Sequence, residues 1–316
     1  MMTDTPKPRL IITGAAGLIG QNLITRFKAR GDYDIVAIDK HPTNIVTLRD
    51  LHPDITVIEA DLAQPGNWQE AFAGGGTLIL NHAQIGALEE QPFIDNNVTA
   101  TRNVLQATRD AGINYIVHIS SSVVNSRAVD FYTESKKAQE KLVVESGIPA
   151  CILRPTLMFG WFDRKHLGWL ARFMQKVPVF PVPGNGKFIR QPLYAGDFCS
   201  VIMSAVDAPR PGEAYDISGR EKLYYIDLIK ALRTAIGSRT PIIKIPYGLF
   251  ELMLRTYALV DKNPPFTVNQ LEALVIPEEF EIIDWPGIFG VKATPLSAAL
   301  AETHQHPVYS KINLEF

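Results

Sequence analysis

The chain has 316 residues, of which 46% are hydrophobic and 20% are charged, a composition typical of a globular protein with a sizeable core. Its formal net charge of −2 argues against a surface for nucleic acid or for an anionic membrane, so neither partner is predicted. The N-terminal residues lack the apolar core of a signal peptide, and no uncharged run reaches the roughly 18 residues that a membrane-spanning helix needs.

The cysteine usage indicates a reducing compartment. Cys151 and Cys199 both lie in apolar segments, which predicts buried free thiols and favours a cytoplasmic location. Cysteine and histidine do not occur at metal-ligand spacing, so no metal site is predicted.

Three glycines near the N-terminus carry the strongest signal. Gly14, Gly17 and Gly20 follow the apolar run 10–13 and open the amphipathic stretch 18–30. This pattern predicts a strand, a tight turn and a helix whose N-terminus points at the turn. Because such a turn lets the backbone approach a pyrophosphate closely, a dinucleotide is predicted to bind there.

An acidic residue follows the next apolar run, 35–38. Asp39 lies 19 residues after Gly20, where a carboxylate accepts hydrogen bonds from the adenosine ribose and repels a 2′-phosphate. NAD is therefore favoured over NADP, although Lys40 and His41 could partly offset the repulsion. The alternative is a solvated carboxylate at a strand end.

Strands and helices alternate through the first half of the chain. The predicted strands are 10–13, 35–39, 56–59, 77–81, 115–120 and 150–154, and the predicted helices are 18–30, 67–73, 92–111 and 131–146. Such alternation predicts an α/β fold with a Rossmann-type doubly wound parallel sheet. Residues 1–155 are expected to form the NAD-binding domain with the catalytic Tyr/Lys pair.

The amino-acid composition changes after residue 155, where proline and glycine become frequent. We expect residues 156–316 to form mainly a smaller C-terminal α/β lobe and cap that bind substrate, with some segments returning to the Rossmann core. Further helices are predicted near 196–207, 225–237, 246–259 and 267–275.

The chemical centre is predicted in the helix 131–146. Tyr132 and Lys136 are spaced i, i+4 and so share one helix face. A tyrosine pKa near 10 is too high for a base, but a neighbouring ammonium and a cationic nicotinamide both favour the phenolate. Lys136 could also bind the nicotinamide ribose. Ser121, in the serine triplet 120–122 after a strand, could hold a substrate oxygen, although an ST-turn or N-cap is the alternative.

In this order, the motifs resemble the extended short-chain dehydrogenase/reductase superfamily and its NAD-dependent epimerase/dehydratase family. The resemblance covers most of the chain and implies the catalytic set Ser121, Tyr132 and Lys136, with Ser122 as the fallback serine. Asn97 would support the active-site helix and a proton-relay water, and Arg190 would contact a substrate phosphate, unless it makes a surface salt bridge. The substrate-binding residues implied are Ser121, Ser122 and Arg190. The cofactor-binding residues predicted or implied are Gly14, Ala16, Gly17, Leu18, Ile19, Gly20, Asp39, Asp61, Leu62, Asn81, Ala83, Gln84, Asn97, Ser120, Tyr132, Lys136, Pro155 and Thr156.

Three features depart from the family pattern. Only 11 residues separate Ser121 from Tyr132, Asn125-Ser126 replaces Tyr-Gly, and Gln84 replaces a small residue. The short interval, Gln191-Pro192 and the tail near 264–271 look more like an atypical branch similar to the respiratory complex I accessory subunit. Many members of that branch lack the catalytic tyrosine and only bind a nucleotide.

We therefore expect an NAD-dependent oxidoreductase or epimerase that transfers a hydride at a secondary alcohol or ketone, with a nucleotide-sugar as substrate. The alternatives are a structural or assembly protein that binds NAD, and a dehydrogenase or reductase of a non-sugar alcohol. The resemblance also implies a homodimer through the helices that carry Asn97 and Tyr132. Residues that could form its face are Val98, Val104, Leu105, Phe131, Leu142 and Val143; ordinary core packing is the alternative.

Overall fold

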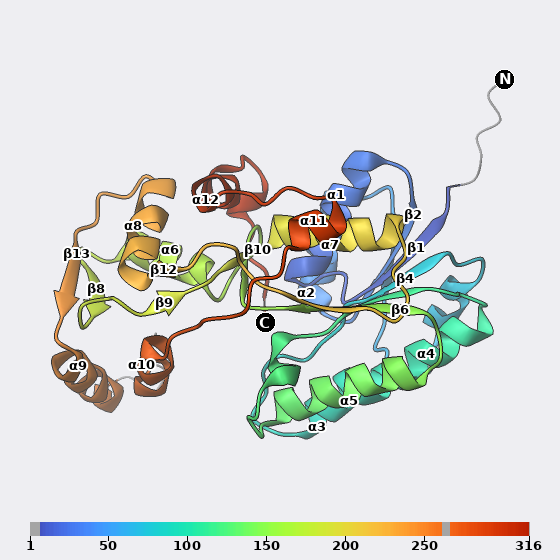
Figure 1. Ribbon diagram of the computed structural model, residues 1–316, viewed down its shortest axis with the longest axis horizontal. Helices are drawn as coiled ribbons and strands as arrows, with labels where there is room; N and C mark the ends of the chain where they lie inside the picture. The colour runs from blue at the N-terminus through green and yellow to red at the C-terminus, as the bar shows by residue number, and fades with distance from the viewer. Residues whose placement is uncertain (1–6, 261–265, 316) are drawn as a thin grey trace.

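The computed structural model describes residues 7–260 and 266–315. Seven parallel strands form one sheet in the order β11-β6-β5-β4-β1-β2-β3, and helices cover both faces (Figure 1). The strands are β1 Arg9–Thr13, β2 Asp34–Asp39, β3 Thr56–Glu59, β4 Thr77–Leu80, β5 Ile116–Ile119, β6 Ala150–Pro155 and β11 Ala214–Ile217. This order reverses at β1 and confirms the predicted doubly wound sheet.

Alternation of side chains along the strands builds one apolar core on each face of the sheet. Leu10 and Ile12 pack in the core that also contains Phe27 of α1 (Leu18–Arg30) and Phe198 of α7 (Ala195–Asp207). Ile11, between them, packs in the opposite core with helices α4 (Ala100–Asp110) and α5 (Phe131–Glu145). Because α7 and β11 both come from the second half of the chain, that half also contributes to the sheet domain.

The helix between β2 and β3 was not predicted. α2 (Pro42–Leu51) begins with proline at its first position, where the missing N–H costs nothing. The ring of His41 caps it by accepting the N–H of Asn44 at 3.2 Å. The sequence between β2 and β3 therefore contains a helix-start signal that the predicted elements do not include.

The predicted helix 92–111 is divided into three parts. α3 (Gln91–Phe93) leads into a π-helical turn, η2 (Ile94–Thr99), and α4 follows. A π-turn inserts one residue into a helix and is frequently found at functional sites. Here it carries Asn97, which was predicted to support the active site.

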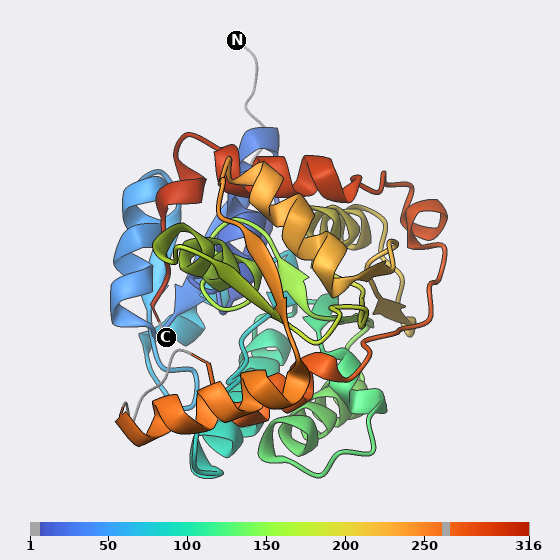
Figure 2. The same cartoon turned by 90° about the vertical axis from the view of Figure 1, so that its left-hand side faces the viewer.

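The C-terminal half gathers into a smaller lobe beside the sheet domain (Figures 1 and 2). Its helices are α6 Leu167–Lys176, α8 Tyr225–Ala235, α9 Tyr247–Val260, α10 Val268–Val275 and α12 Leu296–Gln305. Its short strands are β7 Met158–Phe159, β8 Phe180–Pro183, β9 Ile189–Arg190, β10 Leu193–Tyr194, β12 Leu223–Tyr224 and β13 Ile242–Ile245. Within the described ranges, no helix has the length and hydropathy needed to cross a membrane.

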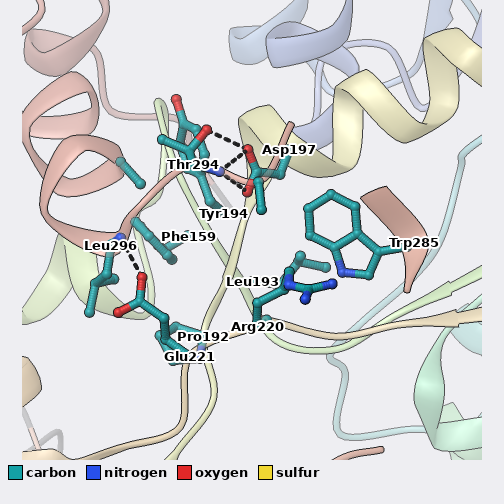
Figure 3. A pocket seen from close by; sticks show the side chains of 13 residues that line it. Phe159, Pro192, Leu193, Tyr194, Asp197, Arg220, Glu221, Trp285, Thr294 and Leu296 are labelled. Carbon is teal, nitrogen blue, oxygen red and sulfur yellow. Dashed lines mark hydrogen bonds between the residues drawn. The ribbon is translucent and has the colours of Figure 1, made fainter. Parts of the chain in front are cut away.

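A small cavity lies between α7 and the segment that leads into α12 (Figure 3). Its volume is about 30 Å³, on the scale of one water molecule. The carboxylate of Asp197 accepts the N–H and the hydroxyl of Thr294, and Glu221 accepts the N–H of Leu296 at 2.7 Å. Asp197 therefore fastens the C-terminal segment to α7 of the sheet domain, and Glu221 binds the same segment from the chain before β12.

Candidate nucleotide-binding and catalytic site

The three positions of the first turn hold glycine for different structural reasons. Gly14 has φ of 63°, and a Cβ there would lie 2.7 Å from Cα of His82. A Cβ on Gly20 would lie 2.4 Å from the carbonyl oxygen of Ala15. Gly17 precedes α1 and would place a Cβ no closer than 3.4 Å to the backbone. Packing thus requires glycine at Gly14 and Gly20, whereas Gly17 leaves room for an approaching ligand.

The start of α1 suits an anion. Gly17 provides no side-chain cap, and the first turn, which contains Leu18 and Ile19, has no acidic residue. The first N–H groups of a helix need partners outside the helix and carry its partial positive charge. The turn therefore fits the pyrophosphate of a dinucleotide.

Asp39 lies at this turn. Its carboxylate accepts the N–H of Ala16 at 2.8 Å and the N–H of His41 at 2.9 Å. Lys40, which could have offset its charge, instead donates to Asp61 at 3.2 Å and to Asn96. Asp39 remains placed for the ribose role predicted for it.

Residues after β4 brace the glycine turn. Asn81 donates its side-chain amide to the carbonyl of Gly14 at 3.0 Å, and its N–H donates to Thr13 Oγ1 at 3.1 Å. The buried ring of His82 lies between Thr13 Oγ1, 2.9 Å from Nδ1, and Thr101 Oγ1, 3.1 Å from Nε2. Burial lowers the pKa of His82 to about 3, so this ring is a neutral part of the scaffold. His82 was not singled out from the sequence.

Other predicted cofactor residues lie along the same strand ends. Leu62 is buried in the core that packs on α4, and Asp61 before it accepts the N–H of Ala63 at 3.0 Å. Ala83 is exposed after β4. Gln84 is half-buried and accepts the side-chain amide of Asn96 at 2.9 Å.

Asn97 ties the cofactor side to the catalytic helix. It is fully buried, accepts the N–H of Gln84 at 2.6 Å and donates to Ser135 Oγ at 2.8 Å. Ser135 in turn donates to the carbonyl of Tyr132 at 2.9 Å. The π-turn thus places the side-chain amide of Asn97 between the segment after β4, which contains Gln84, and helix α5, which contains Ser135.

Ser121 and Tyr132 lie together at the carboxyl end of β5. Ser121 caps the short helix η3 (Ser122–Asn125), accepting the N–H of Val123 at 3.4 Å, and Tyr132 lies in the first turn of α5, which Asp130 caps. Burial raises the pKa of Tyr132, and a hydrogen bond with the Ser121 hydroxyl lowers it in part. The ST-turn alternative for Ser121 therefore accounts for its contact with the N–H of Val123 but not for its interaction with Tyr132. Ser122 is half-buried within η3.

Lys136 lies deeper than predicted. Only 1% of the residue is exposed, and its amine donates to the carbonyl of Ile119 at 3.0 Å and to Gln139 Oε1. Burial lowers the pKa of Lys136 to about 7, and Glu140 raises it in part. We expected this ammonium to lower the pKa of Tyr132. In the structure that pKa is instead raised, because burial outweighs the Ser121 hydrogen bond and the amine points towards β5.

The remaining predicted positions differ in whether their side-chain polar atoms already have hydrogen-bond partners in the protein. The hydroxyl of Ser120 donates to Glu140 at 2.6 Å, and Glu140 also pairs with Arg154. Pro155, at the end of β6, is buried, and so is Thr156, whose Oγ1 has no hydrogen-bond partner among the described residues. A buried hydroxyl without a partner is costly unless a ligand satisfies it, so Thr156 fits the nicotinamide side of the cofactor.

Arg190 was predicted to contact a substrate phosphate, and the structure gives its guanidinium other partners. It donates to the main-chain carbonyls of Ile189 at 2.9 Å and Ile276 at 2.8 Å, and to that of Leu274. Only 7% of the residue is exposed. Arg190 therefore holds the C-terminal end of α10, where helix carbonyls lack partners within the helix.

The chain is similar to known proteins over most of its length. The chain is 26% identical to a 3β-hydroxysteroid dehydrogenase/Δ5→4-isomerase of Mycobacterium tuberculosis, over 75% of this chain and 72% of that protein. It is also 26% identical to a ceramide reductase of Caulobacter vibrioides over 96% and 90%. A mitochondrial NADH dehydrogenase [ubiquinone] 1 alpha subcomplex subunit 9 of Mus musculus is 24% identical over 96% and 82%.

Solved structures show the same fold. A UDP-glucuronic acid 4-epimerase from Bacillus cereus, in complex with NAD, superposes with a TM-score of 0.70 at 20% identity, over 94% of this chain and 98% of that one. The terminal R domain of a myxalamid biosynthetic enzyme gives 0.72 at 19% identity, over 96% and 90%. The model of the NAD dependent epimerase/dehydratase family matches residues 10–218. The chain therefore belongs to this family of NAD-dependent enzymes.

Proposed function

We propose that this enzyme transfers a hydride at a secondary alcohol or its ketone, with Tyr132 as the group that takes or gives the hydroxyl proton. The observation that carries the proposal is that Tyr132, in the first turn of α5, lies against Ser121 at the carboxyl end of β5, where the Ser121 hydroxyl lowers the pKa of the tyrosine in part. Ser121 would hold the substrate oxygen while Tyr132 moves its proton. NAD, when bound, supplies the hydride acceptor.

Lys136 would hold the nicotinamide ribose in this site. Two acceptors already bind its amine, Ile119 O and Gln139 Oε1, and an ammonium has a third hydrogen to donate. Glycine at Gly17, the carboxylate of Asp39 and the unpartnered hydroxyl of Thr156 support a dinucleotide along the strand ends.

A nucleotide-sugar is the first substrate class, because several enzymes of the same fold act on such molecules. The second candidate is a secondary alcohol without a diphosphate. The bonds of Arg190 to three main-chain carbonyls favour it, because a guanidinium already committed to them has little capacity left for a phosphate. Re-reduction of the ketone from the other face would make the enzyme an epimerase, and release of the ketone would make it a dehydrogenase.

The first experiment is mass spectrometry of the nucleotide released when the purified protein is denatured. Stoichiometric NAD would support an enzyme that keeps its cofactor, as an epimerase does, and an empty protein would support one that exchanges it. Recovery of NADP would contradict the role proposed for Asp39.

A substrate panel then separates an enzyme from a binding protein. Nucleotide-sugars and secondary alcohols without phosphate are added to the NAD complex, and the absorbance of reduced nicotinamide is followed. A signal that the Tyr132→Phe variant lacks would support the proposal. No change in absorbance with any compound would favour a structural or assembly protein that binds NAD.

A homodimer through α4 and α5 is part of the proposal. Phe131 and Val144 are exposed on α5 and support such a face, whereas Val104, Leu105 and Val143 are buried in the core of a single chain. Sedimentation that shows only monomer at micromolar concentration would contradict the dimer.

A further inference from the structure

The side chain of Gln139 links Lys136 to His82 and Thr101, which lie beside the residues that brace the glycine turn. Gln139 follows Lys136 by one helical turn on α5 and is fully buried. Its Oε1 accepts the lysine amine, while its Nε2 donates to Thr101 Oγ1 at 3.0 Å and to the carbonyl of His82 at 3.2 Å. Because both amide hydrogens have acceptors, the carbonyl end cannot turn away from the lysine without losing two bonds.

The network continues to the nucleotide turn. Thr101 Oγ1 contacts the His82 ring, whose other nitrogen contacts Thr13 Oγ1. Thr13 accepts the N–H of Asn81, which donates to the carbonyl of Gly14. An unbroken chain of hydrogen bonds therefore joins the amine of Lys136 to the glycine turn.

We propose that Gln139 is a positioning residue for Lys136: fixed by Thr101 and His82, its side-chain carbonyl holds the lysine amine at the end of β5 and leaves one N–H for the cofactor ribose. The inference rests on the proposed function in taking Lys136 as the residue that binds the ribose. Gln139 itself touches neither cofactor nor substrate in this assignment, and acts through Lys136.

The protonation of Lys136 gives a measurable consequence. A hydrogen bond to the charged form of a group favours that form, so loss of the Gln139 carbonyl should lower the pKa of the lysine below its present value of about 7. The titratable groups that interact with the amine are Glu140 on α5, His118 on β5 and His82 after β4, and Tyr132 precedes Lys136 by one turn on α5.

None of these neighbours is expected to titrate near neutrality. The pKa of His82 lies at about 3 and that of His118 well below its ordinary value, in both cases chiefly through burial. The pKa of Glu140 is lowered by Arg154 and Ser120 despite burial, and the pKa of Tyr132 is raised. A change in NAD affinity near pH 7 that Lys136→Met abolishes would therefore report Lys136.

The test measures NAD affinity of the full-length protein by calorimetry across the neutral pH range. In the wild type, affinity should fall as pH rises through the lysine pKa, and Lys136→Met should abolish this change. Gln139→Met should move its midpoint down by about one pH unit, and Gln139→Glu, which adds a negative charge, should move it up.

Two further variants guard against a general loss of structure. Thr101→Val removes a group that fixes Gln139 without touching Lys136, and it should move the midpoint down by less than Gln139→Met does. Gln191 is a matched control, because this buried amide also donates twice, to Ser218 and Gly219, and accepts once, from Phe280. Gln191→Leu should leave the midpoint unchanged.

Opposite shifts in the Met and Glu variants would support the inference. A midpoint in folded Gln139→Met equal to that of the wild type would overturn it, as would a wild type whose NAD affinity does not titrate. Turnover of the wild type and of Tyr132→Phe is measured separately on the substrate panel. The proposed hydride transfer can therefore fail or stand independently of Gln139.

Discussion

Lys136 and Arg190 are two buried cations, both expected from the sequence to bind a ligand, and the structure treats them differently. The amine of Lys136 has one main-chain acceptor and one side-chain acceptor, which leaves a hydrogen for a ligand. The guanidinium of Arg190 donates to three main-chain carbonyls, two of them beyond its own strand at the end of α10. A motif places a charge in the fold, but the acceptors around it decide whether the charge serves a ligand or the chain itself.

Among the substitutions that test this comparison, the largest effect on turnover is expected at Tyr132, one helical turn before Lys136. Tyr132→Phe removes the hydroxyl that moves the proton and should lower turnover by about 10³-fold. NAD affinity should stay within a few-fold, since the ring still fills the same space. Steady-state kinetics and calorimetry on the same preparation measure both quantities. Turnover that survives the change would remove Tyr132 from its role.

Lys136→Met should lower turnover by about 10²-fold and at the same time stabilise the protein without cofactor, by on the order of 2–4 °C in Tm. The pKa of Lys136 falls from 10.5 in the unfolded chain to about 7 in the folded chain. The buried charge of Lys136 therefore lowers the free energy of unfolding of the wild type. That cost is complete below pH 7 and disappears as pH rises from about 7 to 10.5. The gain in Tm should therefore be largest in acid, and thermal melts at several pH values check it. A gain that grew with pH would contradict the assignment.

Arg190→Met should act in the opposite sense. Its loss leaves main-chain carbonyls of Leu274 and Ile276 without their donor and should lower the free energy of unfolding by about 2 kcal/mol. The KM for substrate should change little if the guanidinium serves only the chain. Denaturant unfolding and kinetics measure the two effects, with Arg220→Met as control, since Arg220 is an exposed partner of Asp284. A large rise in KM with unchanged stability would break the comparison and restore the phosphate role.

The smallest effect is expected at Thr156. Thr156→Val removes a hydroxyl that has no partner in the described structure, so stability without cofactor should not fall, while NAD affinity should fall a few-fold. Thr108 is the matched control, because its buried hydroxyl donates to the carbonyl of Val104 at 2.7 Å. Thr108→Val should lower stability and leave NAD affinity unchanged. Equal behaviour of the two variants would mean that Thr156 is an ordinary core residue.

The sequence predicted the sheet domain well because its signals are local. The helix 18–30 and the strand 56–59 begin and end as predicted, and Ser121 meets Tyr132 because α5, the helix after β5, begins near the carboxyl end of that strand. The signals for Gln139 and Thr101 were weaker. Gln139 lies one turn beyond Lys136, but a polar residue on a helix usually faces solvent, and only the tertiary structure buries this one.

The sequence could not show where Arg190 donates. Its partners lie about 85 residues later in the chain, at the end of α10, and main-chain carbonyls leave no residue-type signal. The depth of Lys136 was hidden for a related reason. Helical spacing placed its Cα on the same face as Tyr132, but the long side chain turns towards β5.

The π-turn η2 also fixes how many residues this part of the chain can have. A π-turn is an α-helix with one residue too many, so deletion of one residue within 94–99 would let the helix run on as regular α. Everything on its N-terminal side would then rotate by about 100° relative to α4 and rise by about 1.5 Å. Asn97 could no longer face Gln84 and Ser135 together, although the helix itself would be more regular. Length variation among proteins built on this plan should therefore be found in the loops and avoid this turn.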